Sequence, residues 1–339
     1  MNKFNTVGID LAKNVFQVHI NDPHGKKLSS KQIKRNQLLS YLVQQPESLV
    51  AMEACCGAHY WAREIRKLGH QVKVIHPSYV KPFVQLHKND QRDAAAICEA
   101  AVRPNIPAVA VKSAEQMDLQ AIHRVRERVV KERTAIGNEL RGILLEAGIT
   151  IAQGVAALRS QVPLLLEDAE NGISHRLRLL IQDLMDQWRI ADDRAQRYKV
   201  ELEQIATVTP LCKLLMKIPG IGPINATLLL SHAGDAKHFK SSRHFSAYLG
   251  LVPRQYASGG KEQLGGITKH GNGHVRKQLV HGARSAYRSL LKEPQSTRLG
   301  RWLAGLEGKH PNKIIIALAN KLARIIWVVL SREVAYQAN

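Results

Sequence analysis

The sequence predicts an α/β domain at the N-terminus, a long helical segment in the middle and a mainly helical domain at the C-terminus. Three patterns support this order. Apolar strand patterns alternate with helix patterns up to about residue 108, apolar residues then recur at helical spacing, and glycine-marked turns separate shorter segments near the end. We therefore expect domains over residues 1–110, 111–207 and 208–339.

The first domain is expected to open with a β-hairpin. "TVGID" (6–10) and "VFQVHI" (15–20) are apolar runs separated by a short polar-tipped segment, "LAKN". "SLVAMEA" (48–54) and "QVKVIH" (71–76) predict two further strands, and a helix over 59–69 ends at a glycine between them. This is an α/β pattern that begins with an antiparallel pair.

Four acidic residues stand out in this domain. Asp10 interrupts an apolar strand, and Glu53 ends the strand "LVAME". Asp90 and Asp93 lie three residues apart in a helix expected around 89–102, a spacing that places both carboxylates on one face. A buried carboxylate is costly unless it is paired or binds a cation, although Asp10 alone equally fits an exposed strand edge. Together the four acids suit Mg²⁺ or Mn²⁺ ions about 3.5–4 Å apart.

The middle segment is expected to form two long helices. The first runs from Ser113 to about Ala147, where Gly148 ends it. In the second, apolar residues recur from Leu177 to Ile205 in alternating steps of four and three, which is a heptad pattern. The pattern favours a coiled coil and hence a homo-oligomer, a dimer or a tetramer. The alternative is an amphipathic core helix of a single chain.

The third domain contains two glycine motifs. "IPGIGPINAT" (218–227) is typical of a helix-hairpin-helix turn. In such a turn, the backbone N–H groups around Gly220 and Gly222 are available to bind a nucleic-acid phosphate. The alternative is an ordinary turn between two helices. "QYASGGKEQLGG" resembles a surface turn, but its Ser258 is a hydroxyl beside two glycines in a basic region, and a serine can attack a phosphate when a metal or a cation activates it.

Basic residues surround this serine and continue into the helix after "KHGNGHVRK". Lys261, Lys269 and Arg276 are candidates to assist Ser258, without a choice among them. The helix is expected either to bind nucleic acid or to present a solvated amphipathic face. The expected nucleic-acid-binding side chains are Lys261, Lys269, Arg276, Lys277, Arg284 and Arg288.

The charge of the whole chain favours a polyanionic partner. Lys and Arg number 49 against 28 Asp and Glu, for a net charge of +21. The N-terminus has no signal-peptide pattern, and Lys321 and Arg324 interrupt the apolar stretch "KIIIALANKLARIIWVVL", so we expect a cytoplasmic bacterial protein outside the membrane. The four cysteines form no CxxC pair, which argues against a zinc finger.

Six motifs, in order, give the chain a family resemblance: "GIDLAK", "AMEACCGAHYW", "KNDQRDA", "IPGIGPINA", "YLGLVPRQYASGG" and "GITKHGNGHVRK". They resemble the DEDD insertion-sequence transposases, which include the Piv-type DNA invertases and the bridge-RNA-guided recombinases. The resemblance covers essentially the whole chain. It implies a RuvC-like N-terminal domain of RNase H fold, a coiled coil and a C-terminal transposase domain.

The resemblance also implies a mechanism. It assigns the acid tetrad to Asp10, Glu53, Asp90 and Asp93 as metal ligands and catalytic groups, and it assigns Ser258 as the nucleophile that links transiently to DNA. The expected activity is transposition by strand exchange on element ends and target DNA, with Mg²⁺ or Mn²⁺ and, in many relatives, a noncoding guide RNA. Active sites shared between subunits are also implied.

Two other functions remain open at this point. One is a RuvC-like structure-selective endonuclease that uses the same acids with water as the nucleophile. The other is a non-enzymatic nucleic-acid-binding scaffold built on the hairpin unit and the basic helix.

Overall fold

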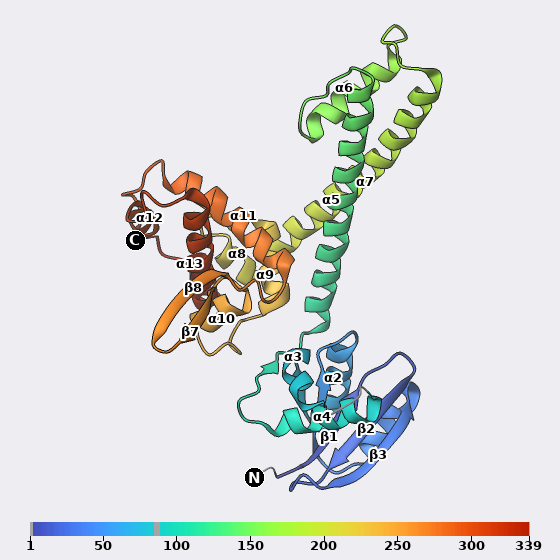
Figure 1. Cartoon of the computed structure of the whole chain (residues 1–339), viewed down its shortest axis with the longest axis vertical. Helices are drawn as coiled ribbons and strands as arrows, with labels where there is room; N and C mark the ends of the chain where they lie inside the picture. Colours follow the sequence, from blue (N-terminus) through green and yellow to red (C-terminus); the bar gives the residue numbers. More distant parts are fainter. Residues whose placement is uncertain (1–2, 85–88, 339) are drawn as a thin grey trace. The chain divides into compact units, whose positions relative to one another are not determined.

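The computed structural model of the chain describes residues 3–84 and 89–338 (Figure 1). The chain divides into two compact units, Met1–Glu115 and Gln116–Asn339. The first unit contains a mixed α/β sheet with helices, consistent with the expected RNase H-like domain, and the second is mainly helical.

The first unit is built on a six-stranded sheet with the strand order β3-β2-β1-β4-β5-β6. The first three strands are antiparallel, β1, β4 and β5 run parallel, and β6 is antiparallel to β5. The hairpin and the two later strands expected from the sequence are confirmed. The bounds are β1 (Asn5–Asp10), β2 (Val15–Asn21), β3 (Lys27–Lys34), β4 (Ser48–Glu53), β5 (Gln71–Ile75) and β6 (Ala108–Val109).

Helices cover both faces of this sheet. On one face, α1 (Leu38–Val43) and α2 (Ala58–Lys67) pack on Val7, Ile9 and Phe16. On the other face, α4 (Asp90–Val102) packs on Ala51 and Ile75 through its alanine-rich side. The remaining short elements are η1 (Arg35–Gln37), α3 (Pro77–Val80) and η2 (Lys81–Phe83).

Gly8 allows α4 to lie very close to the central strand. A Cβ atom built at this position would lie 2.2 Å from the carbonyl oxygen of Ala94 and 2.8 Å from the Cys98 sulfur. Real Cβ atoms do not approach so closely, so only glycine permits this packing. The N-terminal turn of α4, which carries Asp90 and Asp93, is thereby held beside β1.

The second unit begins with three helices, α5 (Ala114–Glu146), α6 (Val155–Glu167) and α7 (His175–Val208). The α7 residues of the expected heptad pattern pack within the same chain. Ile181 and Trp188 join a core with Leu140 and Leu144 of α5, and Ala191 and Ala195 pack on Val129. The apolar seam of α7 is therefore filled by α5 and α6 along these positions, and the structure leaves the expected coiled coil between chains unconfirmed.

The rest of the second unit is a helical domain with one exposed β-hairpin. Its core unites residues from α7 and from six helices of the domain itself. The hairpin strands pair antiparallel with each other. The bounds are α8 (Pro210–Leu215), α9 (Pro223–Ala233), α10 (Ser242–Tyr248), β7 (Pro253–Ser258), β8 (Lys261–Ile267), α11 (Gly273–Leu290), α12 (Arg298–Ala304) and α13 (Pro311–Arg332).

Within the described residues, α13 is the one helix long and apolar enough to cross a membrane. Half of its most apolar window is buried inside the protein. Ile315, Leu318, Leu322 and Ile326 of this helix belong to the core of the C-terminal domain, which accounts for the apolar composition of the segment.

The long helix α5 is fixed to this domain by polar contacts, of which the one made by His123 is buried. His123 Nε2 lies 3.1 Å from Thr227 Oγ1 of α9, and the Gln120 amide donates to the Ser231 carbonyl at 2.7 Å. Glu127 accepts from Lys277 of α11 at 3.0 Å. Burial, together with nearby positive charge, lowers the pKa of His123 to about 3, so the imidazole stays neutral in this contact.

We expect Gly8→Ala to destabilise the first unit by about 1–3 kcal/mol, because the added methyl meets the α4 backbone rather than a side chain that can rotate away. Urea denaturation would measure the change. Gly266→Ala is the matched control, since it is also a strand glycine and its Cβ would meet nothing within 4 Å. Equal stability of the two variants would contradict the role given to Gly8.

Candidate active site

Two of the candidate acids end neighbouring parallel strands. Asp10 is the last residue of β1 and Glu53 is the last residue of β4, and the register pairs Ile9 with Met52 just before them. The two carboxylates therefore emerge at the same edge of the sheet. The carboxyl ends of parallel strands are the usual place for a site in an open α/β sheet.

The other two acids stand in the first turn of α4. Asn89 caps this helix, since its side-chain oxygen accepts from the Gln91 backbone N–H at 3.0 Å. Asp90 and Asp93 follow within the first turn, where the positive end of the helix dipole favours negative charge. The local sequence thus both starts the helix and places two acids on it.

The fold brings three of these carboxylates together. One oxygen from each of Asp10, Asp90 and Asp93 lies within 4.8 Å of the others. Asp10 and Asp93 are half-buried and Asp90 is exposed, so the group is open on one side. The structure thus brings three of the four expected acids together, and their role as metal ligands stays a prediction.

Glu53 lies outside this group of three but close to it. Burial raises the pKa of the Cys55 thiol first, and the negative charges of Glu53 and then Asp10 raise it further. Both carboxylates therefore act on the same sulfur.

The donor set fits a hard divalent cation. Carboxylate oxygens are the preferred ligands of Mg²⁺ and Mn²⁺, and three anionic groups at this spacing repel one another until a cation is placed between them. The open side of the group leaves room for water or a phosphate oxygen to complete the coordination. Asp10, Asp90 and Asp93 are thus the residues that would hold the ion, with Glu53 beside them.

Ser258 is the last residue of β7 in the second unit. The two glycines after it form the turn of the hairpin, with φ of +55° at Gly259 and +77° at Gly260, as a two-residue hairpin turn of this kind requires. The segment is therefore more ordered than the flexible surface turn that its composition resembles, because paired strands reach the turn on both sides. Every residue of β7 is exposed, so the hydroxyl is accessible.

The register distinguishes the basic residues proposed to assist Ser258. Lys261 is the residue directly opposite it, and opposed residues in a hairpin have Cβ atoms about 5 Å apart. The Arg276 guanidinium instead donates to the carbonyls of Leu249 and His270, at 3.3 and 2.7 Å. Lys269 lies in the loop that Arg276 stabilises, with φ of +59°.

Gly220 has a packing role in the second unit. A Cβ atom here would lie 2.2 Å from the Gly282 carbonyl of α11, so the pair of glycines brings the α8–α9 turn against that helix. Gly222 is exposed at the start of α9 and has open space around it. The structure has two helices joined by this turn, and a DNA-binding role for it stays a prediction.

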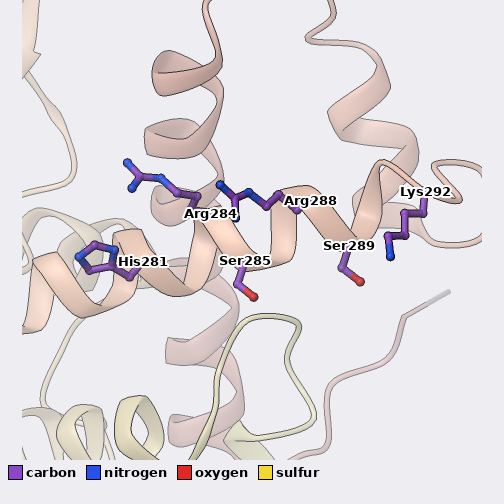
Figure 2. Close-up of a pocket in the computed structure, with 6 residues that line it drawn as sticks. All are labelled: His281, Arg284, Ser285, Arg288, Ser289 and Lys292. Atoms are coloured by element: carbon purple, nitrogen blue, oxygen red, sulfur yellow. The ribbon is translucent and has the colours of Figure 1, made fainter. Parts of the chain in front are cut away.

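The basic residues expected on α11 divide into two groups. Lys277 pairs with Glu127 and, like Arg276, contributes to the packing of the unit. Arg284 and Arg288 instead line a shallow hollow of about 350 Å³ on the exposed face of the helix. Figure 2 shows this face, whose other lining residues are His281, Ser285, Ser289 and Lys292.

Removing one ligand should abolish metal-induced stabilisation of the first unit. We expect Mn²⁺ to raise the melting temperature of the wild-type chain, because an ion that binds only the folded state stabilises it. Asp93→Asn should lose this rise, and Glu47→Gln, which changes an exposed acid elsewhere in the same unit, should keep it. Differential scanning calorimetry with Mn²⁺ and with EDTA measures both, and an equal rise in the two variants would contradict the site.

Comparison with known families places these residues in a defined context. The family model described as "Transposase IS116/IS110/IS902 family" matches residues 212–297, which include Ser258. A second model, of the DEDD transposases of the IS110 type and described as "Transposase", matches residues 7–149, which include the four acids.

Full-length relatives agree with the family models. A "Probable family 20 transposase" of Pseudomonas aeruginosa is 44% identical over 333 residues, covering 98% of this chain and 98% of the relative. The "Transposase for insertion sequence element IS1328" of Yersinia enterocolitica is 42% identical and covers 97% and 98%. The "Transposase for insertion sequence element IS1111A" of Coxiella burnetii is 39% identical and covers 99% and 92%. The chain therefore belongs to the IS110 family of insertion-sequence transposases, enzymes that cut and rejoin DNA by phosphoryl transfer.

Proposed function

We propose that the chain recombines insertion-sequence DNA with two sets of groups, a metal-bound acid tetrad and the Ser258 nucleophile. The observation that carries the proposal is the meeting of Asp10, Asp90 and Asp93 within 4.8 Å. Membership of the DEDD family implies the use of a divalent metal, and Mg²⁺ or Mn²⁺ is the ion that this oxygen-only donor set favours. A divalent cation bound there supplies electrostatic stabilisation of the charge that develops on a scissile phosphate.

The residues of the chain have separate tasks in this proposal. Asp10, Glu53, Asp90 and Asp93 hold the cation and orient the phosphate. Ser258 loses its hydroxyl proton as Oγ attacks phosphorus, and a phosphodiester to the protein forms. The phosphorus–oxygen bond to one DNA strand breaks, and that oxygen takes up a proton and leaves as a hydroxyl. A hydroxyl of another DNA strand then attacks the serine phosphodiester and releases Ser258. Bond energy is conserved throughout, so no nucleotide cofactor is required.

Lys261 is the cation that we propose to assist Ser258. Its register position opposite the serine is fixed by the two-residue turn, whereas the Arg276 guanidinium is engaged by backbone carbonyls. A neighbouring ammonium group favours the ionised form of a hydroxyl. It would also stabilise the negative charge on the phosphate under attack.

We further propose that the C-terminal part binds nucleic acid along α11. From Lys261 to Asn339 the sequence has 14 Lys and Arg, 4 Glu and no Asp, a net charge of +10 (14 − 4). Arg284 and Arg288 lie one helical turn apart on α11 and project to the same side in Figure 2, and Lys292 follows just after the end of the helix. Helix positions four residues apart are separated by about 6 Å along the axis, a spacing that suits successive phosphates of one strand.

The guide RNA, the homo-oligomer and the three-part domain division belong to the same proposal. The net charge of +21 suits RNA as well as DNA, which supports a guide RNA. The α7 side chains Leu179 and Ile190 are exposed and lie about three helical turns apart on one face of the helix, which supports contact with a second chain. A cytoplasmic location follows for an enzyme that acts on bacterial DNA.

A covalent-trapping experiment tests the serine mechanism. Labelled element-junction DNA, Mg²⁺ and RNA transcribed from the element flanks are mixed with the protein and separated on a denaturing gel. We expect label to migrate with the wild-type chain and to disappear in Ser258→Ala and in Asp10→Asn. Ser296→Ala, an exposed loop serine of the same unit, should keep the label.

The other outcomes identify the alternative functions. DNA that is cut without protein-linked label, and is still cut by Ser258→Ala, would show that water is the nucleophile. A non-enzymatic scaffold would be supported if the wild-type protein binds the DNA tightly but leaves it uncut, both with and without metal.

Salt dependence tests the α11 surface. Arg284→Gln/Arg288→Gln should weaken DNA binding at all sequences and reduce the slope of log K against log salt by about 1.8, because each lost phosphate contact removes about 0.9. Fluorescence anisotropy in EDTA at several salt concentrations measures this slope. Arg176→Gln/Arg197→Gln on α7 makes the same charge change away from α11, and an equal effect of both pairs would contradict a specific α11 contact.

A further inference from the structure

A second hollow lies in the first unit, at the same end of the sheet as the carboxylates. Its volume is about 640 Å³, in the range of small-molecule binding sites. Its residues come from the β1–β2 turn and β2, the end of β3 with the segment after it, and α2. They are Asn14, Val15, Lys34, Arg35, Asn36, Leu39, Tyr60 and Trp61.

The lining combines two cations with an aromatic wall. The Trp61 ring packs edge-on against Phe16 and Tyr60, with centroids 5.2 Å apart in each pair. The Arg35 guanidinium lies over the Trp61 ring at 5.1 Å, and its Nη1 donates to the Lys13 carbonyl at 3.4 Å. Trp61 is 5% exposed and Tyr60 is 47% exposed, so Tyr60 is the ring available for stacking.

The cations of this hollow have no acidic partner among its lining residues. Two ion pairs elsewhere in the first unit join Lys67 to Glu64 and Arg103 to Glu99, and neither includes a lining residue. Lys34 and Arg35 therefore present positive charge to an open space that also holds aromatic and amide groups. That combination suits a phosphate joined to a flat, uncharged ring, because the cations attract the phosphate and the ring stacks on an aromatic face.

The hollow lies close to the acid cluster. Asp10 is opposite Gln17 in the β1–β2 register, and Val15 stands two residues from Gln17 on β2. Two residues of strand extend about 7 Å, and neighbouring strands are about 4.8 Å apart. The Cα atoms of Val15 and Asp10 are thus within about 10 Å of each other. Because α2 and α4 lie on opposite faces of the sheet, a strand of a few nucleotides would reach both sites around this end of the sheet.

We propose that this hollow holds an unpaired nucleobase of the DNA strand whose phosphate lies at the acid cluster, an inference that rests on the proposed function. The base stacks on Tyr60, and the adjoining phosphate contacts Lys34 and Arg35. The hollow is a positioning subsite for the strand to be cut. An unpaired base is required because a base within a duplex is already stacked on both faces and cannot stack on Tyr60.

Binding of short single-stranded DNA in EDTA tests the subsite without any cleavage. Tyr60→Ala should weaken binding by about five-fold or more, the loss typical of one stacked base, and Tyr60→Phe should keep it. Lys34→Gln should weaken binding and reduce the slope of log K against log salt. Two control variants should bind like wild type. Tyr79→Ala removes another tyrosine of the same unit, which is 44% exposed, and Lys27→Gln changes a lysine at the other end of β3.

Probes of altered chemistry separate base from backbone and DNA from RNA. An oligonucleotide with abasic positions should bind wild type more weakly and should no longer distinguish Tyr60→Ala from wild type. The same sequence as RNA, bound with an equal or larger Tyr60→Ala effect, would overturn the assignment to the DNA strand.

Two further results would overturn the proposal in different ways. Tight binding that Tyr60→Ala leaves unchanged would refute the subsite and leave the proposed function standing. Absence of binding by wild type to any DNA or RNA would refute both the subsite and the proposed function.

Discussion

Mutual repulsion of the carboxylates is the constraint on which the rest of the first unit depends. Three like charges within 4.8 Å are unfavourable without a cation, so the fold must supply the free energy that keeps them together. Asp10 is held by a central strand with neighbours on both sides, and Asp90 and Asp93 are held by a capped helix. Gly8 is what allows the two elements to lie close enough, because any side chain there would meet the α4 backbone.

The second unit is built around a different requirement. A helix as long as α7 needs a partner for its apolar face, and α5 and α6 provide it within one chain. Polar contacts such as His123 to Thr227 then join α5 to the C-terminal domain, so the long helices and that domain form one compact unit. The position of Ser258 within its hairpin is defined by the register that pairs it with Lys261.

Sequence patterns predicted the elements that carry strong periodic or chemical signals. The apolar runs around Val7, Val18 and Val50 gave β1, β2 and β4, and the Asp90/Asp93 spacing gave a shared helix face. β3 was missed because "KLSSKQIK" is polar on both faces, as an edge strand at the surface can be. The β7–β8 strands were missed for the same reason, since almost every residue in them is exposed.

Other features depend on tertiary contacts that no local pattern carries. The sequence around Gly220 does not reveal that an added Cβ there would meet the carbonyl oxygen of Gly282, a residue far along the chain. Arg276 and Lys277 read as a nucleic-acid surface, yet carbonyls and Glu127 engage them. The aromatic hollow beside the acids joins residues 14, 34 and 60, which the fold alone brings together.

The β7–β8 hairpin that carries Ser258 is exposed along both strands. A two-stranded hairpin with solvent on both faces gains little from burial and is only marginally stable alone. A partner that covers Tyr256 and Leu264 would restrict the motion of the hairpin. The binding free energy of that partner must offset the conformational entropy that the hairpin loses. Under the proposed mechanism, a partner that orders this hairpin would also order the Ser258 hydroxyl beside its turn.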